Sequence, residues 1–367
     1  MQHRITTPSK LLDKHGMLIQ KGYATSPLLR FQRKDVPSKL RLKEWDYYLI
    51  YNDSYAAALT VGKSCSILLV SATLIDFSRK AESTKSFVRY VPDKYLSMPE
   101  TSDKGNIHYQ DSEFRISIIH NKDQRHIGLF IKDFIKKKKF SGQSSLPGDI
   151  QENADEYNIA GNKLTLSVTL FDEPKDSMAI ATPFPKSKRQ FYYNRKIIGM
   201  SAGGYAKAGG CNICFSPLDS FGLLDWGRGV WPYKTTWYWG ACQGVIDGNR
   251  FGFNLGYGFG DTSAATENML FFNGYASKLE DVAFHIPRNS KGEYEYGKPW
   301  RITSSDDRLK LVFTPLLDRS ADLSIFLLST NQHQVFGKYT GTAVLDNGTI
   351  ICLYDFPGFA EKVKNRW

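Results

Sequence analysis

The chain has 367 residues, of which 41% are hydrophobic and 23% are charged, which excludes a disordered or collagen-like polypeptide. A single hydrophobic core stops growing at roughly 250–300 residues, so we expect two domains, 1–178 and 179–367. The formal net charge is +11, but the only dense basic run is residues 136–139. Without clustered basic residues and stacking aromatic residues, this charge predicts no specific nucleic-acid partner.

No stretch approaches the roughly 18 consecutive apolar residues that a membrane-spanning helix needs, and the first ten residues lack the apolar core of a signal peptide. We therefore expect a soluble, cytoplasmic protein with no transmembrane segment. Five cysteines are an odd number in a long chain, which argues against a disulfide scaffold and indicates reduced, mostly buried thiols.

Strand patterns recur along the chain. Residues 66–75 form an apolar run rich in β-branched side chains, and apolar and polar residues alternate in 114–118, 164–170 and 309–313. Alternation with a period of two is typical of half-buried strands. The 30 glycines and the aromatic content of 14% also suit strands that are joined by tight turns.

Turn motifs favour antiparallel pairing of these strands. Asp247-Gly248 and Asn347-Gly348 supply the positive φ angles that hairpin turns require. Short helices are predicted only at residues 127–140, 217–224 and 360–366. Closing a sheet removes its exposed edges. We therefore expect an all-β protein with two consecutive antiparallel β-barrel-like domains and few short helices.

A tryptophan-rich stretch carries the first candidate site. Asp225 and Arg228 stand three residues apart among glycines, so their carboxylate and guanidinium can pair and position a polar group of a ligand. An ion pair that only holds a loop is an equally good interpretation, since ion pairs are often structural. The tryptophans predicted to contact a ligand are Trp226, Trp231, Trp237 and Trp239.

A glycine-rich stretch follows at residues 252–261, where Gly256, Gly258 and Gly260 alternate with aromatic residues. It is not a phosphate-binding loop, because no helix follows it. In a strand, glycine at every second position leaves one face open, so we expect the wall of a cavity. Further residues predicted to contact a ligand here are Asn254, Tyr257, Phe259, Asp261 and Asn268.

Two more carboxylates, Asp261 and Glu267, lie next to this predicted wall and could meet Asp225 at a barrel mouth. A carboxyl desolvated by Trp and Phe rings has a raised pKa and can donate a proton near neutral pH. Catalytic roles are therefore predicted for Asp225, Arg228 and Glu267. Loop capping is the alternative role of Asp261 and Glu267.

Cys211 and Cys214 form a lone CxxC pair. Structural zinc normally needs four Cys or His ligands, and the sequence has no second close pair. We therefore expect no metal at this pair, and no nucleotide or other cofactor elsewhere.

Six motifs stand out over the length of the chain, at residues 11–24, 41–48, 225–239, 258–261, 266–268 and 355–359. Together they resemble a bacterial family known only as a domain of unknown function. A tryptophan-rich carboxylate loop followed by a glycine-rich aromatic strand is more distantly similar to the two-barrel, lipocalin-like (calycin) proteins, which include carotenoid hydratases and tocopherol cyclases. Those relatives carry an aspartate near the barrel entrance, and the resemblance implies that place for Asp225. The His often found beside that aspartate is absent, so Arg228 would take its part.

Three classes of function are compatible with these features. The first is a protein that binds a small apolar or amphipathic molecule and, if it is an enzyme, is a cofactor-free hydratase, cyclase or lyase with Asp225 or Glu267 as the acid. The second is a carbohydrate-active or glycan-binding protein with stacking Trp residues and a carboxylate pair. The third is a non-catalytic structural or binding protein. The predicted partner is a small-molecule ligand, and the sequence predicts no oligomeric state.

Overall fold

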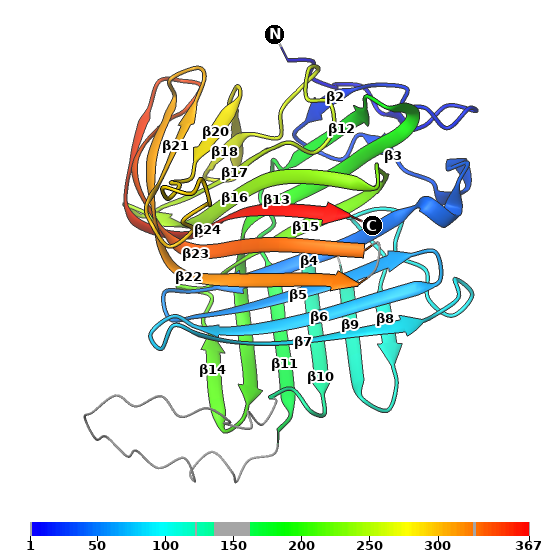
Figure 1. The fold of residues 1–367 in the computed structure, drawn as a ribbon, viewed down its shortest axis with the longest axis horizontal. Helices are drawn as coiled ribbons and strands as arrows, with labels where there is room; N and C mark the ends of the chain where they lie inside the picture. Colours follow the sequence, from blue (N-terminus) through cyan, green and yellow to red (C-terminus); the bar gives the residue numbers. More distant parts are fainter. Residues whose placement is uncertain (1, 122, 136–161, 326–327, 367) are drawn as a thin grey trace.

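A computed structural model describes residues 2–121, 123–135, 162–325 and 328–366. In these residues the chain forms two curled antiparallel β-sheets and one short parallel pair, β1 (Ser9–Lys10) with β3 (Leu29–Arg30) (Figure 1). The helices described are two single 3₁₀ turns, η1 (Arg33–Asp35) and η2 (Lys39–Arg41). The predicted all-β class with two antiparallel barrel-like units is confirmed.

The first sheet has 13 strands. Its path is β7-β6-β5-β4-β15-β13-β11-β10-β9-β8; in addition, β12 and β14 pair with β13, and β2 pairs with β12. The strands are β2 (Gly22–Ala24), β4 (Lys43–Tyr51), β5 (Tyr55–Ser64), β6 (Ile67–Asp76), β7 (Ala81–Tyr90), β8 (Ile107–Gln110), β9 (Phe114–Asn121), β10 (Gln124–Ile131), β11 (Leu164–Phe171), β12 (Met178–Phe184), β13 (Ser187–Ala208), β14 (Cys211–Phe215) and β15 (Phe221–Val230).

The second sheet has nine strands in the order β19-β18-β17-β16-β24-β23-β22-β21-β20. Three of them, β22 to β24, are long neighbours that run side by side in Figure 1. The strands are β16 (Lys234–Ile246), β17 (Asn249–Tyr257), β18 (Met269–Phe272), β19 (Tyr275–Lys278), β20 (Val282–His285), β21 (Trp300–Ser304), β22 (Leu309–Ile325), β23 (Leu328–Val344) and β24 (Ile350–Arg366).

The chain passes from the first sheet to the second between Val230 and Lys234. Strands β12 to β15 follow residue 177 in the chain but belong to the first sheet. The change of sheet therefore falls later than residue 178. The division at 178/179 between folding units stays a prediction.

The hairpin predictions are confirmed. Asp247 and Gly248 have φ angles of 49° and 75° and join β16 to β17, while Gly348, with φ of 84°, closes the turn between β23 and β24. The helix predictions are wrong within the described residues, because the segments at 127–131, 221–224 and 360–366 pair as strands. Long-range pairing overrides weak helical patterns. The basic run at 136–139 lies outside the described residues.

The expectation of mostly buried thiols is also wrong. All five cysteines are free thiols, and only Cys242 is buried. Cys211 and Cys214 lie on β14, which pairs with a single neighbour, β13, so its side chains are less covered than those of a central strand.

Side chains fill three layers, because successive residues of a strand point to opposite faces. One layer fills the concave interior of the first sheet, and a second fills that of the second sheet. The third, which we call the seam, lies between the two sheets where β13 and β15 contact β16 and β17. On β15, Leu224 and Trp226 belong to the first interior, whereas Leu223 belongs to the seam.

Arg228 lies on the interior face of β15 and is fully buried. Its Nη1 donates to Asp46 Oδ1 at 3.0 Å, its Nε lies 3.4 Å from Glu44 Oε1, and its guanidinium carbon lies 4.2 Å from the centre of the Trp226 ring. The guanidinium also donates to the backbone carbonyls of three residues, Trp45, Pro99 and Gly227. This cluster anchors the first interior.

We predict that Arg228→Met destabilises the protein strongly, because the buried Asp46 loses its ion-pair partner, whereas Glu44 keeps Arg33 at 2.8 Å. Removing one partner of a buried ion pair costs about 3–5 kcal/mol of unfolding free energy, which lowers Tm on the order of 10 °C. Thermal unfolding measures this, with Arg301→Met on an exposed strand position as the control. Equal Tm values for the two variants would contradict the assignment.

Candidate functional site

A buried ammonium group lies at the centre of the seam. Lys196 Nζ lies 3.1 Å from Asp225 Oδ2 and 3.8 Å from Glu267 Oε2, and 4.2 Å above the Trp239 ring. All four residues are buried. A charge is expensive to bury without a partner, so the ion pairs and the ring face are what make this position tolerable for the ammonium.

Strand register brings the first pair together. Lys196 on β13 stands directly opposite Asp225 on the antiparallel strand β15. Residues that face each other in this way have side chains on the same face, within reach of an ion pair. Asn194, two residues before Lys196, donates from Nδ2 to Asp225 Oδ1 and to the carbonyl of Trp226. Both oxygens of Asp225 are therefore engaged.

Glu267 is contributed by the second sheet, just before β18. Asn254 donates from Nδ2 to the Glu267 carbonyl at 2.8 Å and accepts from Trp239 Nε1 at 2.7 Å. The Glu267 carboxyl packs against Gly256, where a Cβ atom would lie 2.5 Å from Oε1. The position thus requires glycine, because a larger residue would displace the carboxyl.

A third carboxylate, Glu361 on β24, completes the cluster and is 4% exposed. Its Oε1 accepts a hydrogen bond of 2.9 Å from Trp237 Nε1. Desolvation by burial raises the pKa of Glu361 to about 7, although the Trp237 hydrogen bond and the charge of Lys196 act against that rise. Near neutral pH this group can therefore both hold and release a proton.

The cluster holds three carboxyl groups, those of Asp225, Glu267 and Glu361, around the ammonium of Lys196. Burial raises the pKa of Glu267, and the nearby charge of Asp225 adds to the rise, while Lys196 opposes it. Glu267 Oε2 is buried and has no hydrogen-bond partner among the described residues. Its contact with Lys196 Nζ, at 3.8 Å, is an ion pair without a hydrogen bond, so Glu267 is a candidate proton donor to a molecule in the seam.

Aromatic side chains cover one end of the cluster. The Phe259 ring makes edge contacts with Tyr192, Trp231 and Trp237, with ring centres 4.8–5.5 Å apart. Trp45 stacks on Tyr192 and meets Trp231 edge-on. Trp45, Trp237 and Phe259 are half-buried, so this aromatic wall reaches the surface.

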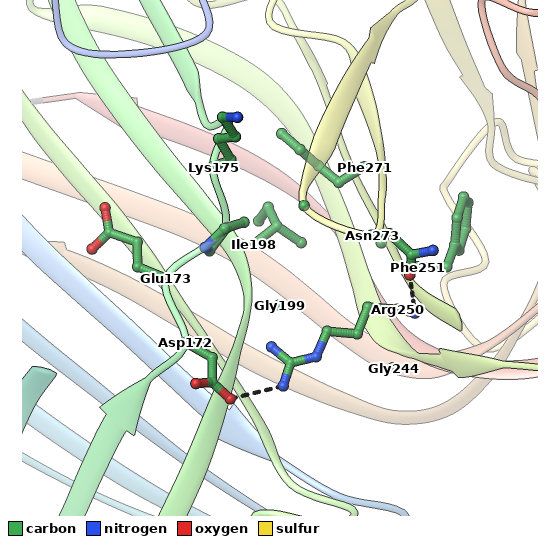
Figure 2. A pocket seen from close by; sticks show the side chains of 13 residues that line it. Asp172, Glu173, Lys175, Ile198, Gly199, Gly244, Arg250, Phe251, Phe271 and Asn273 are labelled. Carbon is green, nitrogen blue, oxygen red and sulfur yellow. Dashed lines mark hydrogen bonds and ion pairs between the residues drawn. The ribbon is translucent and has the colours of Figure 1, made fainter. Parts of the chain in front are cut away.

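A cleft of about 230 Å³ lies at the other end of the seam (Figure 2). Ile198 and Gly252 line it, and these residues stand two positions from Lys196 on β13 and from Asn254 on β17. At about 3.3 Å per residue, the cleft lies roughly 7 Å along the strands from the carboxylate cluster.

Most of the residues predicted from sequence do lie in the seam. Asp225, Glu267, Trp239 and Asn254 meet around Lys196, and Trp231, Trp237 and Phe259 form the aromatic wall. The structure brings these seven residues together from β15, β16, β17 and the segments that follow β15 and β17.

Five other predicted residues lie elsewhere. Arg228 and Trp226 face the interior of the first sheet, and Tyr257 stacks on Tyr238 in the second interior. Asp261 is in a surface loop, where its carboxylate accepts from the backbone of Ser263. The last is Asn268, which supports the site indirectly, because its Oδ1 accepts from Gly256 N at 2.7 Å.

The expectation that Arg228 joins Asp225 and Glu267 is therefore wrong in its geometry. The segment is a strand rather than a loop, and residues three apart on a strand point to opposite faces. Sequence reasoning also missed Lys196, Glu361 and Asn194. The available signal was a charged or amide side chain on the otherwise apolar face of a strand, as at Lys196 between Tyr192 and Ile198.

No group of three or more His, Cys, Asp or Glu residues that could hold a metal ion occurs in the described ranges. Within the same ranges, no helix is long and apolar enough to cross a membrane.

Structural comparison shows the fold in other proteins. An AttH candidate from Nitrosomonas europaea matches with a TM-score of 0.52 at 12% identity, covering 88% of this chain and 92% of its own. Kievitone hydratase from Nectria haematococca gives a TM-score of 0.45 at 10% identity, and CghA in complex with Sch210972 gives 0.49 at 9%; each match covers 89% of this chain and 88% of the other. These likenesses concern the fold.

No curated protein sequence matches the chain significantly. The family described as Domain of unknown function (DUF2804) matches residues 2–367, which confirms the resemblance that the motifs indicate. The chain therefore belongs to the DUF2804 family.

Proposed function

We propose that the protein acts on a small apolar or amphipathic molecule by proton transfer without a cofactor, with Glu267 as the acid. The observation that carries the proposal is the buried Glu267 carboxyl, whose Oε2 has no hydrogen-bond partner in the described chain. Desolvation raises the pKa of this group, so its protonated form is favoured where a substrate would meet it.

The chemistry follows from the contacts of the cluster. The Glu267 carboxyl gives its proton to a carbon of a C=C bond, so that a C–H bond forms and the π bond breaks. The carboxylate that remains is stabilised by Lys196, 3.8 Å away. Water or a group of the substrate then bonds to the cationic carbon, and the proton lost by that nucleophile returns to the carboxylate. This sequence is a hydration or a cyclisation, and its reverse is an elimination.

Asp225 suits a supporting role better than that of the acid. Its two oxygens accept from Asn194 and Lys196, so neither is directed at a substrate. Glu361 suits the role of a second proton carrier, because it accepts from Trp237 through Oε1 only and its pKa lies at about 7. Arg228 has no part in the proposed step, since it faces the interior of the first sheet.

The seam favours a small apolar molecule over a glycan. Sugar binding by stacking requires an exposed aromatic face. Trp239 is 6% exposed, and its ring is enclosed by Tyr47, Phe359 and the Lys196 ammonium. An apolar lining with a few convergent polar groups is typical of small-molecule pockets.

We predict that Glu267→Gln abolishes turnover but leaves Tm almost unchanged, because glutamine keeps the shape and lacks only the transferable proton. Native mass spectrometry of the purified protein is used to search for a bound small molecule, and a compound identified in this way is incubated with enzyme in D₂O. Wild type places one deuterium on carbon, and the variant loses at least about 100-fold in rate.

Glu293→Gln, at an exposed position, is the matched control for this experiment and keeps the wild-type rate. Unchanged deuterium incorporation in Glu267→Gln would overturn the assignment of the acid. Unfolding of that variant would show that the carboxyl is structural.

A second prediction concerns stability and pH. The pKa of Glu361 is about 7 in the folded protein and near 4.5 when unfolded, so the unfolded state releases its proton first as pH rises. The contribution of Glu361 to the free energy of unfolding is fully present below about pH 4.5. It falls by about 3 kcal/mol as the pH rises from about 4.5 to 7. Glutamine does not titrate, so Glu361→Gln removes that loss. The free energy of unfolding of the variant therefore increases relative to that of wild type between pH 5 and pH 8.

Urea unfolding at a series of pH values measures this difference, and ¹³C NMR of the carboxyl group follows the titration directly. Glu293→Gln is again the control, with the same pH profile as wild type. If the difference between Glu361→Gln and wild type is constant over this range, the pKa of Glu361 is not raised.

A further inference from the structure

The cleft at the end of the seam is built from both sheets. Ile198 and Gly199 of β13 line one side, and Arg250, Phe251 and Gly252 of β17 line the other. The segment 172–175 and the turn at residues 273–274 close its rim. Figure 2 shows Asp172 and Arg250 next to each other, joined by a dashed line that marks their ion pair.

Two nitrogens of the Arg250 guanidinium are available to a ligand. Its side-chain hydrogen bonds to described residues both come from Nη2, to Asp172 Oδ2 at 2.9 Å and to Ser201 Oγ at 2.7 Å. The Arg250 side chain is 41% exposed. Nε and Nη1 make no side-chain hydrogen bond to a described residue, and each can offer a carboxylate oxygen a single charge-assisted hydrogen bond.

The other charges around the cleft favour an anion. Lys175 supplies a second cation on the rim and is exposed. The two acidic residues of the lining are already paired, Asp172 with Arg250 and Glu173 with Arg125 and Arg195. A ligand with a negative end therefore meets the ammonium of Lys175, which has no carboxylate partner among the described residues, and the free donors of Arg250 rather than an unpaired carboxylate.

The walls and the volume set the size of that ligand. Ile198, Phe251 and Phe271 give an apolar lining. The backbone at Gly199 borders open space, because a Cβ atom there would meet nothing within 4 Å. A cavity of about 150 Å³ holds one benzene ring, so about 230 Å³ takes a ring with a short chain.

The position of the seam determines how a ligand in the cleft would be oriented. Beyond the cleft, a Cβ atom at Gly252 would lie 2.8 Å from Ile198 Cγ2, so the Ile198 side chain closes the path towards Lys196 and Glu267. An apolar group that enters the cleft meets this side chain first. Ile198 therefore stands between the cleft and the acid cluster.

We infer that the cleft binds the carboxylate end of an amphipathic acid of arylalkyl size, with Arg250 and Lys175 holding the carboxylate and the apolar end directed along the seam towards Glu267. The inference rests on the proposed function for its reaction, but the binding site stands on the cleft alone. It assigns the substrate class to carboxylic acids of small apolar compounds.

The test compares 3-phenylpropionate with 3-phenyl-1-propanol, which has the same ring and chain without the charge. Isothermal titration calorimetry gives Kd for each probe with wild type. The acid should bind at least about tenfold more tightly than the alcohol, as one charge-assisted contact predicts. Arg250→Gln should remove this preference, and Lys175→Gln should reduce it about two- to threefold.

Arg301→Gln, an exposed arginine on β21, is the matched control and should keep the full preference. NMR of the Ile198 methyl groups places the probe, with shifts expected on addition of the acid. Lys175→Gln keeps the test decisive if Arg250→Gln fails to fold. Equal Kd values for acid and alcohol, no binding at about 1 mM, or unchanged Ile198 signals would overturn the inference.

Glu267→Gln separates the two proposals. It should bind 3-phenylpropionate as wild type does, because the acid cluster lies outside the cleft. If deuterium transfer depends on Glu267 but 3-phenylpropionate does not bind, the cleft assignment is wrong and the proposed reaction stands. If 3-phenylpropionate binds in a way that depends on Arg250 but the wild-type protein transfers no deuterium, the proposed reaction is wrong and the cleft assignment stands.

Discussion

The ammonium of Lys196 is the interaction on which the seam depends. It is the cation that three buried carboxyl groups share, two from the second sheet and one from the neighbouring strand of the first. Three full negative charges around one positive charge are unfavourable at this depth, so the cluster retains protons. Desolvation by burial is the main cause of the raised pKa values of Glu267 and Glu361, and the charge of Asp225 adds to it. The charged cluster at which the two sheets meet therefore also favours the protonated carboxyl group that the proposed chemistry needs.

Strand geometry divides the charged residues of β15 into two separate groups. Asp225 points into the seam and pairs with Lys196, whereas Arg228 points into the first interior and pairs with Asp46 and Glu44. Each group therefore has its own counter-charge, and in the seam Glu267 Oε2 keeps no hydrogen-bond partner among the described residues. The two interiors are filled by large side chains, and the cleft lies where the two sheets meet. A ligand site between the sheets therefore leaves both cores intact.

Local patterns in the sequence were sufficient for the fold class and for part of the site. The turn at Asp247-Gly248 has the predicted positive φ angles, and Asp225 and Glu267 share one cluster with Trp239. Arg228 was misplaced because its segment was interpreted as a loop, in which both side chains could point the same way. The local pattern could mark Lys196 as an unusual charged residue on a strand, but the partners of Lys196 and Glu361 depend on register and on contacts between sheets that no local pattern contains. A terminal segment such as 360–366 cannot show from its own residues that β16 and β23 pair with it.

The position of Ile198 connects binding to chemistry. Its side chain packs against Gly252, between a cleft that is open to solvent and an acid cluster that is not. Water has restricted access to Glu267 in this arrangement, and desolvation is the main cause of its raised pKa. A permanently open channel would hydrate the Glu267 carboxyl and lower its pKa. The barrier that Ile198 forms between cleft and cluster therefore helps to keep that pKa raised. A substrate whose apolar end displaces Ile198 would fill the gap that it makes and keep water out. In the proposed function, binding at the cleft and proton transfer in the seam are two successive steps, each of which depends on its own residues.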